Sequence, residues 1–290
     1  MKQYLAVDIG GTSAKYALIE ENGQCGPVRS FATGREMTGE EMEKQLTCAV
    51  NWALEKGAQG VGISCLGITD PSDGRVLAGV ENLPCLLESS PVQLLGKNFP
   101  RLAVAMENDA KAASLGEMWQ GAGQNCRNFL SLVFGTGIGS GLVLEGRLVR
   151  GRHFRAGEIG YWSEGGQAWE QEYSACALFA RTARRLGLLQ LSGQEFFERL
   201  RREDPACREE FDAWAARVGR VMAHVTLLLD LDRILVGGGI SAQGVFLTDR
   251  LQREMDRFLP PDFAGECRVL PAALGNQAAL LGAVYNLLSR

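Results

Sequence analysis

The sequence predicts a mixed α/β fold in which one strand, glycine turn and strand arrangement occurs twice. Residues 3–9 form an apolar run that is followed by a Gly-Gly-Thr turn and by a second alternating run over 13–20. Residues 129–134, a Gly-Thr-Gly turn and residues 141–144 repeat this order. Helical periodicity lies between these strands, so we expect an internal duplication of one α/β unit.

The remaining elements follow from the apolar spacing and the turn residues. Apolar side chains at every fourth position over 38–56 predict an amphipathic helix that ends at Gly57. Further strands are predicted over 61–68, 102–106 and 233–236, and further helices over 110–118, 170–186, 208–230 and 276–289. We place the domain boundary near residues 121–123, which gives a small N-terminal α/β domain over 1–120, joined by the C-terminal helix 276–290, and a larger one over 121–275.

Composition excludes several classes of protein. The chain has 290 residues, 46% of them hydrophobic and 22% charged, so it can form a sizeable core. A net charge of −4 argues against nucleic acid as the main partner, because a duplex binder needs a basic face. We expect no signal segment, no membrane segment and no DNA-reading segment ahead of the first strand, which begins at Gln3.

The cysteines indicate a reducing compartment. None of the eight lies in CxxC or CxH spacing, so neither a zinc cluster nor a disulfide framework is predicted. We expect buried free thiols in a cytoplasmic protein. The cysteines are Cys25, Cys48, Cys65, Cys85, Cys126, Cys176, Cys207 and Cys267.

Three glycine clusters, at residues 10–11, 135–137 and 237–239, each follow an apolar strand. Glycine lets the backbone approach a bulky anion closely, so three such turns favour a nucleotide site over ordinary structural turns. Asp8, at the tip of the first strand, is placed to hold Mg²⁺. A strand rather than a helix follows the turn at 135–137, which disfavours a nicotinamide dehydrogenase.

Glu107-Asn108-Asp109 lies between a predicted strand and a predicted helix. A carboxylate there suits the base that accepts the proton of an attacking hydroxyl in phosphoryl transfer. The alternative is that Asn108 or Asp109 only caps the helix that begins at Ala110, and the residues alone leave both interpretations open.

Together these motifs resemble the ROK family of sugar kinases, which belongs to the actin-like ATPase superfamily. The resemblance extends from residue 5 to residue 285. It implies two ribonuclease-H-like domains around an interdomain cleft, with ATP on one side and a sugar on the other. The motifs are DIGGT at 8–12, ENDA at 107–110, GTGIGSG at 135–141, AGEIG at 156–160, GGGIS at 237–241 and LGNQAALLGA at 274–283.

The resemblance also implies roles for single residues. Asp109 is the expected catalytic base. The expected sugar ligands are Asn82, Asn108, Asp109, Glu158, Glu170 and Tyr161, the last at the position of a family histidine. The expected ATP and Mg²⁺ ligands are Asp8, Gly10, Gly11, Thr12, Lys15, Gly135, Thr136, Gly137, Gly238 and Gly239, and the family habit implies a homodimer.

The chain departs from the family at three places. Tyr161 stands where many members have histidine, and residues 162–169 contain no cysteine, so no structural zinc is expected. Trp162 and Trp169 are expected in the core, and Lys111 is expected to point to solvent. The chain therefore resembles the zinc-less branch, which includes β-glucoside kinases.

Several alternatives stay open. Glucose or a β-glucoside is the favoured acceptor, with N-acetylmannosamine kinase or fructokinase as alternatives. A catalytically inactive sugar-binding sensor is the alternative from another class, because fold alone does not establish activity.

Overall fold

The computed structural model describes residues 1–88, 90–164 and 166–290, and its contacts divide the chain into two compact units. The first unit contains Met1–Gln124, Leu148–Ala156 and Asn276–Arg290. The second contains Asn125–Arg147 and Gly157–Gly275. That the chain forms independent domains with the boundaries 1–120 and 121–275 stays a prediction.

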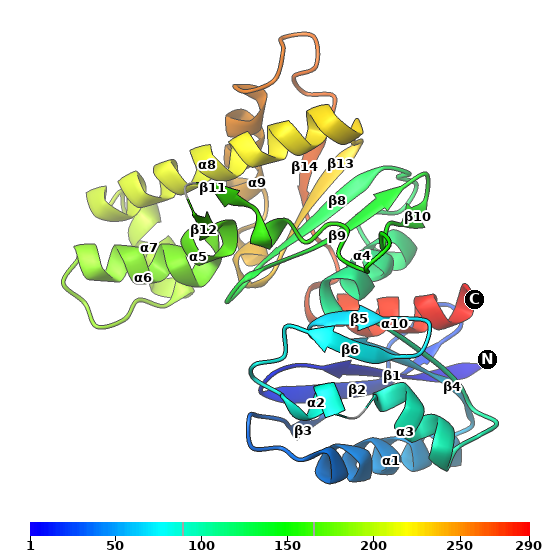
Figure 1. Ribbon diagram of the computed structural model, residues 1–290. Helices are drawn as coiled ribbons and strands as arrows, with labels where there is room; N and C mark the ends of the chain where they lie inside the picture. The colour runs from blue at the N-terminus through cyan, green and yellow to red at the C-terminus, as the bar shows by residue number, and fades with distance from the viewer. Residues whose placement is uncertain (89, 165) are drawn as a thin grey trace. The chain divides into compact units, whose positions relative to one another are not determined.

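The first unit is built on a five-stranded sheet of order β3-β2-β1-β4-β7 (Figure 1). Its central strand β1 is antiparallel to β2 and parallel to β4, which is in turn parallel to β7. Helices α1 and α3 pack on one face, and α4 and α10 pack on the other. The bounds are β1 (Gln3–Ile9), β2 (Ser13–Glu20), β3 (Arg29–Ala32), β4 (Ala58–Cys65), β7 (Ala103–Asn108), α1 (Gly39–Glu55), α3 (Pro91–Asn98), α4 (Asp109–Gln120) and α10 (Ala278–Leu288).

The C-terminal helix α10 completes this unit because it packs closely on α4. A Cβ atom added to Gly282 would overlap the carbonyl of Ala112, and one added to Gly116 would overlap that of Ala278. Two glycines therefore let the backbones approach at a distance that any side chain would prevent. This contact ties the end of the chain to the helix that begins at Asp109.

The second unit repeats the strand arrangement. Its sheet has the order β10-β9-β8-β13-β14, with β8 antiparallel to β9 and parallel to β13. Both sheets thus place a hairpin beside two parallel strands, and the repeated hairpin is the part that the sequence predicted. The bounds are β8 (Phe129–Phe134), β9 (Ile138–Leu144), β10 (Arg147–Leu148), β13 (Arg233–Gly237), β14 (Arg268–Pro271), α5 (Trp169–Tyr173), α6 (Ala175–Arg185), α7 (Gly193–Arg201), α8 (Pro205–Leu229) and α9 (Val245–Asp256).

Short elements complete the two units. They are β5 (Ile68–Asp70), β6 (Arg75–Ala78), α2 (Cys85–Glu88), β11 (Ser163–Glu164), β12 (Gln167–Ala168) and the single 3₁₀ turns Ile159–Tyr161, Gly239–Gln243 and Gly275–Gln277. Within the described part of the chain, no helix combines the length and the apolar character needed to cross a bilayer.

Several expectations about single elements and side chains are wrong. The helix expected over 170–186 is broken at Ser174, whose backbone is extended and whose side chain caps α6 by accepting from Ala177 N at 3.3 Å. Trp162 is 43% exposed, because it lies in the turn before β11, whereas Trp169 is buried as expected. Cys48 and Cys176 are exposed rather than buried, although every cysteine is free.

Candidate active site

In the first unit the predicted residues gather where the parallel strands β1, β4 and β7 end. The sheet register pairs Asp8 with Ser64, Ser64 with Glu107, and Cys65 with Asn108. The carboxyl ends of adjacent parallel strands lie at one edge of the sheet, so Asp8 and the Asn108-Asp109 pair meet there.

Asp8 is held by two neighbouring strands. Ser64 Oγ donates to Asp8 Oδ1 at 2.7 Å, and Lys15 lies opposite Asp8 on β2. Burial raises the pKa of Asp8, while the Ser64 hydrogen bond and the Lys15 charge oppose that rise. A carboxylate that is costly to ionise in this position is suited to a cation, and its hard oxygens fit Mg²⁺.

The Gly10-Gly11-Thr12 turn joins β1 to β2 and contacts Asn82. Gly10 N donates to Ser13 O at 3.1 Å, which closes the turn. A Cβ atom added to Gly11 would lie 3.1 Å from Asn82 Cβ, so the expected sugar-side asparagine packs directly on the expected phosphate turn. The structure therefore brings these two predicted groups together.

Asn108 and Asp109 have separate roles at the start of α4. The Asn108 side chain caps the helix by accepting from Lys111 N at 3.0 Å, and its Nδ2 donates to Gly67 O and to Asp109 Oδ1, each at 2.9 Å. Asp109 Oδ1 also accepts from Ala110 N at 2.7 Å, and the Asp109 side chain is exposed. The cap is thus Asn108, and Asp109 is an exposed carboxylate held in one orientation.

Lys111 does not point to solvent, because its exposed fraction is only 1%. The cause is the packing of α4, which buries residues on most sides of its first two turns. A lysine at this position therefore has its stem within the unit.

The Cys65 thiol lies close to both carboxylates. Burial raises its pKa well above the ordinary value, and the negative charges of Asp109 and Asp8 raise it further. The carboxylates of Asp8 and Asp109 therefore both lie close to the end of β4, although the two residues are 101 positions apart in the sequence.

In the second unit the glycine turn at 135–137 meets the glycines that follow β13. Gly135 N donates to Gly137 O at 3.0 Å, and Cys176 N, at the start of α6, donates to Gly135 O at 3.2 Å. Gly238 has a φ of +84°, and a Cβ atom there would overlap the backbone of Phe134. Only glycine fits at Gly238, which lets the two glycine clusters adjoin.

Glu170, the first acidic residue of α5, closes this glycine turn from one side. Ile138 N donates to Glu170 Oε2 at 3.2 Å. A Cβ atom added to Gly137 would overlap that carboxylate, whereas one added to Gly160 would overlap Ile138 O and lie 3.3 Å from Glu170 Oε2. The residue that the family resemblance assigns to the sugar therefore also contacts the second glycine turn, which is the second expected phosphate turn.

Glu158 lies beside strand β9. Ser140 Oγ donates to Gly157 O, and Ile159 N donates to Ser140 Oγ at 3.5 Å, so β9 fixes the backbone on both sides of Glu158. Tyr161 follows in the 3₁₀ turn and is 58% exposed. Hence the second unit brings Glu170 to the turn of Gly135, Thr136 and Gly137, and the glycines Gly238 and Gly239 follow the strand beside it. Glu158 and Tyr161 lie in the neighbouring segment, which Ser140 holds against β9.

Comparison with known proteins identifies the family. The ROK family model matches residues 4–289.

The chain belongs to the ROK family.

Among the relatives of this ROK protein, a β-glucoside kinase of Listeria innocua is 32% identical over 303 residues, covering 98% of this chain and 96% of the relative. The structure of a ROK family glucokinase from Streptomyces griseus in complex with glucose and AMPPNP has a TM-score of 0.79 and 29% identity, over 97% of each chain. The ROK hexokinase from Thermus thermophilus has a TM-score of 0.81 and 25% identity, over 98% of this chain and 97% of the other. The expected family, fold and class of enzyme, a sugar kinase, are confirmed.

Sequence reasoning missed the residues that hold the site of this ROK protein in place. Ser64 lies inside an apolar strand and in none of the quoted motifs, whereas Ser140 lies within the GTGIGSG motif without an assigned ligand role. A polar residue in register with a strand-end carboxylate is the signal that would have found Ser64. Among the described residues, no three histidine, cysteine, aspartate or glutamate side chains group together as a metal site.

Proposed function

We propose that this protein transfers the γ-phosphoryl group of ATP to a hydroxyl group of a hexose or hexoside, with Asp109 as the base. The observation that carries this proposal is the exposed Asp109 carboxylate, oriented by Asn108 Nδ2 and Ala110 N at the end of β7. Both hydrogen bonds end on Oδ1, and a proton acceptor in a fixed position is what the transfer requires.

The glycine turns are the proposed ligands of the nucleotide. In the first unit these are Gly10, Gly11, Thr12 and Lys15, and in the second Gly135, Thr136, Gly137, Gly238 and Gly239. Backbone N–H groups in such turns bind phosphate oxygens without side-chain obstruction. Asp8 would hold Mg²⁺, which when bound neutralises charge on the phosphates.

The proposed sugar ligands are Asn82, Asn108, Glu158, Glu170 and Tyr161. The Asn108 amide is already engaged by Lys111 N, Gly67 O and Asp109, so its contact with sugar would be shared with its structural role. Carboxylates and amides suit vicinal hydroxyls, and a site of such groups rejects analogues that leave them unpaired.

A β-glucoside is the acceptor we favour. Tyr161 and Trp162 follow Glu158 and expose 58% and 43% of their surface, which is unusual for adjacent aromatic residues. Aromatic faces bind the apolar faces of sugar rings, so this pair suits the second group of a glucoside. The β-glucoside kinase among the relatives supports the same choice.

Three further properties belong to the proposal: the protein works as a homodimer, is cytoplasmic and contains no structural zinc. Elemental analysis of the purified protein tests the last of these, and stoichiometric zinc would contradict it.

The direct test is an ATP-consumption assay with glucose, cellobiose, methyl β-glucoside, fructose, mannose and N-acetylmannosamine. We expect the highest kcat/KM with a β-glucoside, and Tyr161→Ala should reduce that value while leaving the value for glucose within a few-fold. If turnover is highest with N-acetylmannosamine or fructose, that sugar rather than a β-glucoside is the acceptor. No turnover with any of these sugars would favour the inactive sensor.

A further inference from the structure

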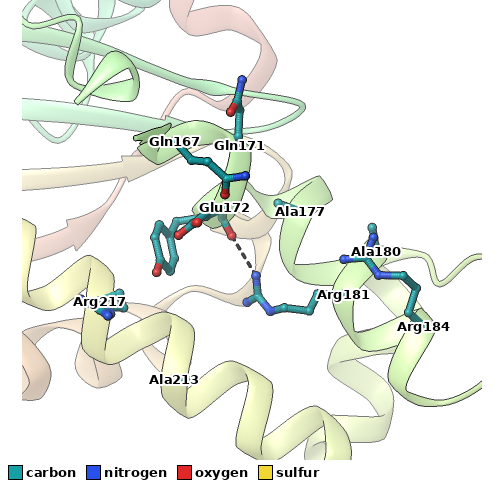
Figure 2. A pocket seen from close by; sticks show the side chains of 10 residues that line it. Gln167, Gln171, Glu172, Ala177, Ala180, Arg181, Arg184, Ala213 and Arg217 are labelled. Carbon is teal, nitrogen blue, oxygen red and sulfur yellow. Dashed lines mark hydrogen bonds between the residues drawn. The ribbon is translucent and has the colours of Figure 1, made fainter. Parts of the chain in front are cut away.

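A pocket of about 650 Å³ lies in the second unit, among β12, α5, α6 and α8 (Figure 2). Three arginines, two glutamines, one glutamate, one tyrosine and three alanines line it, and none of them has a role in the proposed reaction. Its volume is in the range of small-molecule sites, roughly 300–1,000 Å³. We call it the arginine pocket, after Arg181, Arg184 and Arg217.

The arginine pocket carries positive charge. Arg181 is fixed in place, because its Nε donates to Glu210 Oε2 at 2.5 Å and its NH1 donates to Glu172 O at 2.9 Å, the contact drawn as a dashed line in Figure 2. The lining holds three guanidinium groups and one carboxylate, that of Glu172, while Glu210, outside the lining, pairs with both Arg181 and Arg185.

The excess charge is accessible. Arg184 and Arg217 are exposed and project from α6 and α8, and Arg184 has no acidic partner in the part of the chain that the structure describes. Guanidinium groups bind phosphate oxygens in a fork geometry, so Arg184 suits a phosphomonoester together with Arg181, three residues earlier on α6, while Arg217 adds charge from α8 on the other side of the pocket.

The neutral part of the lining suits a polyhydroxyl group. Gln167 and Gln171 offer both donors and acceptors, and the Tyr173 hydroxyl, whose pKa is raised by burial and by its hydrogen bond with Glu172, adds a further polar group. The alanines leave the space between α6 and α8 open. Phosphate-binding and hydroxyl-binding groups thus occur together in one hollow.

Helix α5 connects the arginine pocket to the glycine turn. This helix has only five residues, and its last three line the pocket. On the same helix Glu170 accepts from Ile138 N at 3.2 Å, and Trp169 packs edge-on against Phe134, the residue before Gly135, with ring centroids 6.2 Å apart. A ligand that displaces Arg181 from Glu172 O would allow α5 to move. Glu170 would then lose its hydrogen bond with Ile138 N beside the glycine turn.

We propose that the arginine pocket binds a phosphorylated sugar and that this ligand weakens ATP binding through α5. The binding itself is independent of the proposed kinase activity, whereas the effect on ATP rests on it. Two distinct sites then act on one shared element, which is the requirement for coupling between them.

Isothermal titration calorimetry with glucose 6-phosphate tests the binding. The titration is performed with saturating glucose and a non-hydrolysable ATP analogue present, so that the proposed active site is filled. We expect binding in the wild type, at least tenfold weaker binding in the Arg184→Ala/Arg217→Ala double variant, and no change in Arg253→Ala, an exposed arginine of α9. Equal affinity for inorganic phosphate, or equal binding by the double variant, would overturn the proposal.

Initial rates test the coupling. At saturating acceptor, glucose 6-phosphate should raise the KM for ATP in the wild type and leave it unchanged in the double variant. Inhibition that competes with the acceptor, or that persists unchanged in the double variant, would overturn the coupling because it would come from product binding at the active site. A protein without any kinase activity would contradict the proposed function, and calorimetry would still decide the binding.

Discussion

Arg150 Nε donates to Glu107 Oε2 at 2.7 Å, and Glu107 is the residue immediately before Asn108. Arg150 lies in the segment Leu148–Ala156, which belongs to the first unit although the chain on both sides of it belongs to the second. Arg150 NH2 also donates to Asn286 Oδ1 at 3.1 Å, so the pair joins this segment, the end of β7 and α10. One ion pair thus supports the strand end that carries Asn108 and Asp109.

We predict that Glu107→Ala destabilises the protein by about 3 kcal/mol, the low end for breaking a buried pair, because Glu107 is 1% exposed and Arg150 is 34% exposed. Chemical denaturation measures the free energy of unfolding. The control is Arg75→Ala, which breaks the exposed Arg75–Asp73 pair and should cost about 0–1 kcal/mol. Equal effects of the two substitutions would show that the buried pair has no special role.

The packing of α10 on α4 gives a second prediction. Gly282→Ala places a Cβ atom on the carbonyl of Ala112, so the two helices must separate, and we expect a loss of about 3 kcal/mol or more. Gly96→Ala is the matched control, because nothing lies within 4 Å of a Cβ atom there and α3 should gain about 0.5–1 kcal/mol. Thermal unfolding compares the two. A Gly282→Ala protein that unfolds at the same temperature as the wild type would contradict the close contact between α10 and α4.

The Asp8–Ser64 hydrogen bond predicts a pH-dependent effect. Asp8 has a raised pKa in the folded state, so its ionisation weakens folding as the pH rises from the unfolded value of 3.8 through the folded value. Ser64→Ala removes a bond that lowers this pKa, so the variant's deficit in unfolding free energy should be larger near pH 7 than near pH 4.

Denaturation of Ser64→Ala at several pH values measures this deficit. Ser131→Ala is the control, since Ser131 Oγ is buried without a hydrogen-bond partner among the described residues and its loss should be independent of pH. A deficit for Ser64→Ala that shrinks as the pH rises would reverse the sign and refute the account of Asp8.

Two substitutions of Glu170 separate its contact with the glycine turn from its proposed contact with the sugar. Glu170→Gln keeps an oxygen that can accept from Ile138 N, so we expect the KM for ATP to stay within a few-fold while the KM for the acceptor rises about tenfold. Glu170→Ala loses both contacts, and both KM values should rise. Steady-state kinetics with each substrate varied decides this, and a Gln variant with an unchanged acceptor KM would remove Glu170 from the sugar site.

How far the sequence predicted this molecule depends on the kind of interaction. The β1–β2 hairpin, α1 and the strands that end at the candidate site follow from local periodicity and turn chemistry, and Thr38 supplies the helix start that the sequence indicated. The break at Ser174 was not predicted, because serine is tolerated inside a helix and only its contact with Ala177 N shows that it is a cap.

Burial of Lys111 and the Arg150–Glu107 pair was also beyond the sequence. Both depend on which elements pack together, and the segment Leu148–Ala156 joins the first unit only through contacts far away in sequence. The candidate site shows the same division. Many of its expected ligand residues lie in motifs, whereas the roles of Ser64, which donates to Asp8, and of Ser140, which donates to Gly157 O from within the GTGIGSG motif, are recognised only by their partners.

The most direct measurement is the rate of phosphoryl transfer by Asp109→Asn. An asparagine oxygen can still accept from Asn108 Nδ2 and Ala110 N, so the site should keep its shape and lose only the proton acceptor. The account predicts that kcat falls at least about a hundredfold while acceptor affinity, measured by calorimetry, changes little. A variant that retains more than a few per cent of wild-type turnover would contradict the assignment of Asp109 as the base.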